Sequence, residues 1–176
     1  MKTTASTRYF FHAAYKGKHY RGWQRQLNIR SVQQTLEDVL AEILRKPAVT
    51  IIGCGRTDAG VHASQYFFHT DLTRALPDRF LAILNMRLHD DIAVYDVFEV
   101  ANTMHARFAA TSRSYEYFIS LSKQPFVNDF SADSRGRQFC FESMKKATQL
   151  LPRYQDYRAF CKQPDLHNTT ICKVKS

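Results

Sequence analysis

The carboxylate of Asp58 is the side chain best placed for chemistry in this sequence. It stands in residues 55–62, Gly-Arg-Thr-Asp-Ala-Gly-Val-His, where Gly55 and Gly60 bracket a loop between two apolar runs. Glycine tolerates backbone angles that other residues do not, and it lets a ligand approach the main chain closely. An aspartate presented in this way can serve as a nucleophile or a general base, and the nearby Arg56 guanidinium would favour its charged form. An ordinary turn between strands is the simpler alternative.

Positive charge is the second feature of the sequence that indicates a function. The net charge is +9, from 25 Lys and Arg against 16 Asp and Glu, and it suggests a polyanionic partner. Cations also interleave with Tyr15, Tyr20 and Trp23, so that phosphate contacts and base-stacking rings would lie together. These cations are Lys16, Lys18, Arg21 and Arg25. The alternative is a loop whose aromatic side chains are core; the cations are expected to be exposed under both interpretations.

Composition limits the class of protein. With 44% hydrophobic and 13% aromatic residues, the 176 residues can build a core in one large domain or two small ones. No apolar run approaches the ~20 residues of a membrane-spanning helix, and the polar N-terminus lacks the apolar stretch of a signal peptide. We therefore expect a cytoplasmic protein. The cysteines at 54, 140, 161 and 172 have no CxxC spacing, so we expect reduced thiols and assign no metal.

The elements that must position Asp58 follow from hydrophobic periodicity. Four segments have the alternation or β-branched content of strands: 8–15, 49–54, 64–70 and 92–100. One helix is capped by Ser31 and ended by Pro47, and a second runs over about 77–88. The order strand–helix–strand–strand–helix–strand predicts an α+β unit, with helices on one face of a mainly antiparallel, ferredoxin-like sheet.

A polar joint near residue 105 divides the chain into an N-terminal unit, 1–105, and a second unit, 106–176. In the second unit, alternating side chains predict a strand over 114–121, and helical spacing predicts a helix over 141–151. A further strand is expected over 169–174. These elements amount to an incomplete second α+β unit.

Several motifs resemble those of the TruA-type tRNA pseudouridine synthases. The stretch 55–62 resembles the active-site motif of that family, and 14–26 is similar to its Tyr-Asp-Gly … Gly-Trp-Gln signature, with Lys16 where Asp is usual. Ser-Val-Gln at 31–33, the stretch 105–117 and Asp-Tyr-Arg-Ala-Phe at 156–160 resemble further family segments. The ordered matches cover nearly the whole chain.

The resemblance implies the pseudouridine synthase fold, with Asp58 as the catalytic group. It implies that Arg56 contacts the tRNA and fills the space of the displaced base, and that Tyr115 packs against the target base; a salt bridge and an ordinary strand aromatic are the respective alternatives. It further implies anticodon-arm uridines at tRNA positions 38–40 as targets and a homodimer whose RNA surface spans both subunits. Isomerisation changes no oxidation state, so we expect no cofactor.

A Phe-x-x-x-Met-Val-Arg-like segment, whose arginine would pair with Asp58, follows in the family and is not found here. We therefore expect a fragment or a shortened member, with little or no synthase activity. A non-catalytic RNA-binding module is the main alternative, and release of tritium from uracil C5 distinguishes the two. A glycoside hydrolase is a third class, but it usually needs two carboxylates flanking the bond.

Overall fold

The computed structural model describes residues 6–134, 136–161, 163–166 and 169–175. It divides into two compact units, the first formed by Met1–Phe118 with Asp129–Ser131, and the second by Ile119–Asn128 with Ala132–Ser176. The domain boundary that we placed near residue 105 stays a prediction, since a division by contacts is not a test of independent domains.

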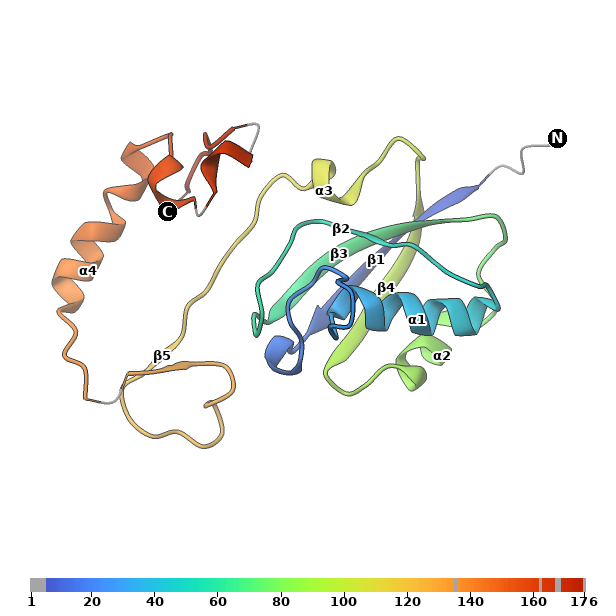
Figure 1. Ribbon diagram of the computed structural model, residues 1–176, viewed down its shortest axis with the longest axis horizontal. Helices are drawn as coiled ribbons and strands as arrows, with labels where there is room; N and C mark the ends of the chain where they lie inside the picture. The colour runs from blue at the N-terminus through green and yellow to red at the C-terminus, as the bar shows by residue number, and fades with distance from the viewer. Residues whose placement is uncertain (1–5, 135, 162, 167–168, 176) are drawn as a thin grey trace. The chain divides into compact units, whose positions relative to one another are not determined.

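The first unit is a four-stranded antiparallel sheet with two helices on one face (Figure 1). The sheet order is β2-β3-β1-β4. Its strands are β1 (Thr7–Tyr15), β2 (Ile52–Gly53), β3 (Ala63–Leu72) and β4 (Ile92–Val100), and its helices are α1 (Val32–Leu44), α2 (Phe80–Arg87) and the short α3 (Ala106–Ala109). A 3₁₀ turn, η1 (Gly17–His19), follows β1. The predicted ferredoxin-like α+β arrangement is confirmed.

The core lies between the sheet and the helices α1 and α2. Successive strand residues point to opposite faces, so Phe11 of β1 faces the helices and stacks on Phe68 of β3 with ring centroids 4.7 Å apart. The ring of Phe80 from α2 meets Phe11 edge-on at 6.3 Å, and Leu36 and Leu40 of α1 are fully buried in the same cluster. This packing fixes the ends of the strands from which the loops leave.

Side-chain hydrogen bonds secure both helices. The Ser31 hydroxyl accepts the Gln34 N–H at 3.2 Å, which confirms the predicted cap of α1. On α2, the Asn85 amide nitrogen donates to the Val94 carbonyl at 2.7 Å, and its oxygen accepts the Val94 N–H at 2.8 Å. Asn85 thereby ties α2 to β4.

The strand predicted over 49–54 is reduced to the two residues of β2. The Ile51 N–H donates to the Glu37 carboxylate at 3.1 Å, and the Ile51 carbonyl accepts from the Gln33 amide at 3.0 Å. These two groups of Ile51 point away from β3 and bind α1. On the β3 side, the Thr70 hydroxyl donates to the Thr50 carbonyl at 2.8 Å, so a side chain takes the acceptor that would have continued the strand ladder.

The strand predicted over 114–121 is wrong for most of its length. Only β5 (Ile119–Ser120) is formed, and it pairs in parallel with β6 (Ala132–Asp133). An alternating pattern becomes a strand only where a neighbouring strand takes up its backbone hydrogen bonds. Among the described residues, 111–118 have no such neighbour.

The second unit otherwise contains α4 (Phe141–Thr148), where a helix was predicted, and the 3₁₀ turns η2 (Leu151–Arg153), η3 (Arg158–Phe160) and η4 (Pro164–Leu166). The strand predicted over 169–174 is wrong, since one bridge between Asp156 and Ile171 is formed there. None of the helices in the described ranges has the length and apolar character needed to cross a membrane.

Candidate functional site

The Asp58 loop and the basic segment after β1 lie against each other. The Trp23 N–H donates to the Thr57 carbonyl at 3.1 Å, and the Gly60 N–H donates to the Tyr20 carbonyl at 3.2 Å. The hydroxyls of Tyr15 and Thr57 are also hydrogen-bonded, 2.9 Å apart. Two stretches far apart in the sequence thus form one continuous surface.

Two glycines permit this close approach. A Cβ on Gly17 would lie 1.9 Å from the Val61 carbonyl oxygen, and a Cβ on Gly22 would lie 2.4 Å from the Thr57 carbonyl oxygen. Gly22 also has φ +90°, a conformation that favours glycine. Both neighbours are backbone atoms, so only residues without side chains fit these positions. The sequence places glycines there, but it does not show what they approach.

Buried aromatic side chains support the loop from below. The Tyr66 hydroxyl donates to the Gly55 carbonyl at 2.5 Å, and the Trp23 ring lies 4.2 Å from the Tyr66 ring. Burial raises the pKa of Tyr66, and it raises the pKa of Tyr15 to about 12. Both phenols therefore stay neutral near pH 7 and can donate hydrogen bonds. Tyr15, Tyr20 and Trp23 are only 4%, 2% and 3% exposed. The interpretation of these three rings as base-stacking surfaces is therefore wrong, and the alternative, a loop whose aromatic side chains are core, is confirmed.

Asp58 stands at the exposed tip of the loop, in a turn closed by the Val61 N–H donating to the Asp58 carbonyl at 3.2 Å. The Arg56 side chain is exposed as well, and within the described part of the chain no ion pair joins the two. The loop backbone around Asp58 is fixed by hydrogen bonds while the Asp58 carboxylate is exposed, as is expected of a side chain that must reach an external substrate.

The four predicted cations are all exposed, but their charges are not equally free. The Lys18 ammonium is 2.5 Å from the Asp129 carboxylate, and this hydrogen bond holds the pKa of Asp129 below its usual range. The Arg25 guanidinium is 2.9 Å from the buried Glu37 carboxylate. Within the described ranges, Lys16 and Arg21 have no carboxylate partner. These two are therefore better able to meet an external anion.

Tyr115 is 80% exposed and lies in the segment that forms no strand. As far as the chain is described, neither a hydrogen bond nor a ring contact links Tyr115 to the Asp58 loop. The structure thus brings the basic segment to Asp58 without placing Tyr115 beside it.

Arg113 makes contacts that the sequence did not predict. Its guanidinium donates to the Cys54 carbonyl at 2.5 Å and to the Arg107 carbonyl at 3.2 Å, so it fastens the segment after α3 to the start of the Asp58 loop. An arginine in a motif is visible in the sequence, but its backbone acceptors are not.

A buried histidine holds the other end of α3. The Ala106 N–H donates to Nδ1 of His69 at 3.2 Å. Burial, followed by the nearby positive charge of Arg8 and by His105, lowers the pKa of His69 to about 4. The imidazole is therefore neutral near pH 7, with Nδ1 as an acceptor.

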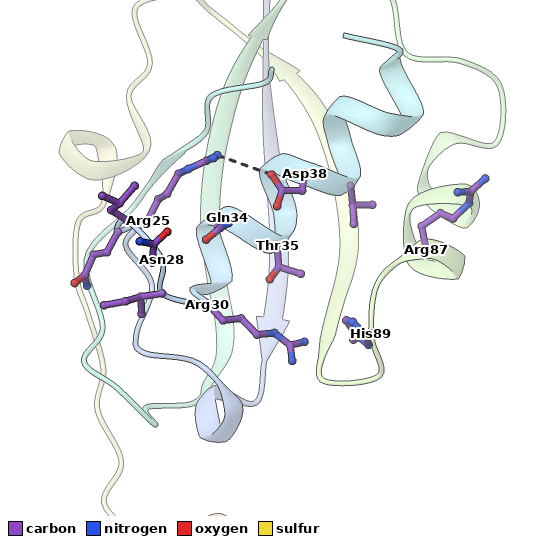
Figure 2. A pocket seen from close by; sticks show the side chains of 12 residues that line it. Arg25, Asn28, Arg30, Gln34, Thr35, Asp38, Arg87 and His89 are labelled. Atoms are coloured by element: carbon purple, nitrogen blue, oxygen red, sulfur yellow. Dashed lines mark ion pairs between the residues drawn. The ribbon is translucent and has the colours of Figure 1, made fainter. Parts of the chain in front are cut away.

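A cavity of about 680 Å³ lies away from the Asp58 loop, between residues 25–30, α1 and the end of α2. Figure 2 shows Arg30, Arg87 and His89 along it, with the guanidinium of Arg25 3.9 Å from the Asp38 carboxylate. Arg87 is paired with Glu42. With two of its arginines already paired, this cavity is not a site of unbalanced positive charge. In the described residues, no three His, Cys, Asp or Glu side chains are grouped to hold a metal ion.

Comparison with known proteins gives a consistent result. The family model described as tRNA pseudouridine synthase matches residues 12–109, a range that contains the basic segment and the Asp58 loop.

Among curated proteins, the chain is 41% identical over 170 residues to tRNA pseudouridine synthase A of Porphyromonas gingivalis, covering 95% of this chain and 67% of the relative. It is 43% identical over 170 residues to tRNA pseudouridine synthase A of Parabacteroides distasonis, covering 96% and 67%. The chain thus spans about two thirds of the length of these relatives. With a family match over more than half of its residues and more than 40% identity to such relatives, the chain belongs to the tRNA pseudouridine synthase family.

Proposed function

We propose that this chain carries the catalytic group, Asp58, of an enzyme that isomerises uridine to pseudouridine in tRNA. The observation that carries the proposal is an exposed carboxylate, in the family's motif, on a loop fastened to a basic segment. From the resemblance to the family we also propose the anticodon-arm positions 38–40 as targets, a homodimer as the working form and the cytoplasm as its location.

The reaction is an isomerisation, so uridine and pseudouridine contain the same atoms, and the only exchange needed is that of a proton. The C1′–N1 bond of the uridine breaks, the uracil turns, and a C1′–C5 bond forms. C5 loses its hydrogen as a proton, and N1 gains a proton. The Asp58 carboxylate can attack the sugar or the base as a nucleophile, or it can remove a proton from C2′. All three routes need the carboxylate beside the target nucleoside, at the ribose for two of them and at the uracil ring for the third.

A stacked uridine must leave its helix before Asp58 can reach it, which costs a few kcal/mol. Phosphate contacts of Lys16 and Arg21 can offset this cost without reading the base. We assign Arg56 to the space that the base vacates and Tyr115 to stacking on the target base. The high exposure of Tyr115 leaves its ring free for such a contact.

We expect the 176 residues alone to have little or no synthase activity, so the parent in this test is the chain extended by the family's Phe-x-x-x-Met-Val-Arg-like segment. The test compares this parent with its Asp58→Asn variant on a tRNA transcript that carries tritium at uracil C5. Asp78→Asn is the matched control, because it removes an exposed carboxylate in the loop before α2. We expect tritium release by the parent and the control, none by Asp58→Asn, and RNA binding by all three. Release by Asp58→Asn near the parent rate would contradict the catalytic assignment. Binding without release by the parent would favour the non-catalytic RNA-binding module.

A further inference from the structure

We propose that Lys16, Lys18 and His62 form a binding site for one nucleotide of the RNA, and that Asp129 and Phe130 occupy this site in the free chain. The proposal rests on the proposed function in one respect, namely that the ligand is RNA. It adds a site that includes His62, and it adds a segment of the chain that competes with the ligand.

Asp129 and Phe130 make two contacts on the basic segment and the motif loop. The Asp129 carboxylate is 2.5 Å from the Lys18 ammonium. The Phe130 ring lies 5.0 Å from the His62 ring, centroid to centroid, and the Lys16 ammonium is 5.3 Å from the Phe130 centroid. One anion and one aromatic ring are thus held by two cations and an imidazole.

These contacts are of the same chemical kinds as those of an RNA nucleotide. A phosphate would take the place of the carboxylate on Lys18, since lysine binds both as a point charge. A base would take the place of the phenyl ring, since bases in single strands stack on aromatic side chains and on cations. Both replacements occur on the same surface as the Asp58 loop.

The receiving surface is built independently of the segment that covers it. The Gly17 backbone lies directly against the Val61 carbonyl, which places Lys16 and Lys18 beside His62. Asp129–Ser131 belong to the first unit, although the residues on either side of them belong to the second. Asp129 and Phe130 lie outside every strand of the four-stranded sheet, so their contact can be given up without taking that sheet apart.

His62 also has an unused polar atom. Its Nδ1 is buried and has no hydrogen-bond partner in the described residues. A phenyl ring cannot supply one, whereas the edge of a nucleobase carries both donors and acceptors. A base in place of Phe130 would satisfy this atom, and the occupant seen in the free chain does not.

The test measures binding of the full chain to a tRNA transcript and to a short oligouridylate, over a range of salt concentrations. Asp129→Asn frees one ammonium, so it should steepen the slope of log K against log salt by about 0.7. If parent and variant bind equally at ~1 M salt, this difference in slope predicts binding tighter by about eightfold at ~50 mM salt and about fourfold at ~150 mM. Phe130→Ala should tighten binding by a factor that does not depend on salt, because no charge is changed.

Asp78→Asn and Phe126→Ala are the matched controls. The first makes the same change in net charge elsewhere, and the second removes a ring that is 95% exposed. Equal or weaker RNA binding by both Asp129→Asn and Phe130→Ala, relative to these controls, overturns the inference whatever the isomerase assay shows. Tighter binding by the variants, with no tritium release by the parent, supports this site and counts against the proposed reaction alone.

Discussion

Alanine substitutions at three glycines in or against the Asp58 loop should lower stability for different reasons, which separates the effect of backbone strain from that of steric overlap. Gly60→Ala introduces strain alone, because φ is +80° and no atom lies within 4 Å of the new Cβ. Gly17→Ala introduces overlap alone, 1.9 Å from the Val61 carbonyl oxygen. Gly22→Ala introduces both, with φ +90° and a distance of 2.4 Å to the Thr57 carbonyl oxygen.

The expected costs follow from these distances. A left-handed alanine costs roughly 1–2 kcal/mol, which sets the value for Gly60→Ala. An ordinary contact at a Cβ begins near 3.4 Å, so Gly17→Ala must push the loop back by about 1.5 Å, at a cost of about 2–3 kcal/mol. Gly22→Ala should combine the two effects and cost about 3–4 kcal/mol.

Urea unfolding of the three variants measures the stability, and C5 tritium release measures the catalytic consequence. We expect Gly17→Ala and Gly22→Ala to lose most of their activity, since the loop moves, while Gly60→Ala retains more of it. If Gly17→Ala and Gly22→Ala are no less stable than Gly60→Ala, the close approach does not hold the loop and the reasoning fails.

Two further predictions concern charge. The pKa of His69 lies near 4 in the folded chain, against an ordinary value of 6.5. As the pH falls, His69 therefore takes up a proton in the unfolded chain at a higher pH than in the folded chain. Stability should be complete above about pH 6.5 and should decline towards pH 4, by no more than about 3 kcal/mol, and His69→Gln should flatten this decline in urea midpoints. Arg21→Ala should lower the salt slope of RNA binding by roughly 0.7–0.9, and Arg25→Ala by less, because Glu37 already offsets the Arg25 charge. Equal slope changes for the two arginines would show that this pairing does not persist in solution.

The parts of the fold that depend on local pattern could be predicted from the sequence. The strand over 92–100 is found at those bounds, and the helix capped by Ser31 begins where its cap predicts. Alternation and capping are properties of neighbouring residues, so one sequence is enough to reveal them. The exposure of the four cations followed from residue type in the same way, whereas residue type left open whether the neighbouring aromatic rings stack on bases or belong to the core.

The parts that depend on distant partners could not be predicted. The short β2 ends where the Thr70 hydroxyl, 20 residues along the chain, takes up the Thr50 carbonyl. The predicted strand over 114–121 had the right alternation but lacked a neighbour. Arg113 reaches a carbonyl 59 residues away. The roles of Asp58, Arg56 and Tyr115 remain predictions, because they depend on a ligand as well as on the fold.

The Asn85 side chain has a consequence for how this sheet meets other molecules. β4 is an edge strand, and an edge offers unpaired backbone groups to any strand that comes alongside. At Val94 the amide of Asn85 already supplies the donor and the acceptor that an incoming strand would supply. Helix α2 therefore protects part of the edge against aggregation. With Asn85 lost, both groups of Val94 would be free to join the sheets of two copies.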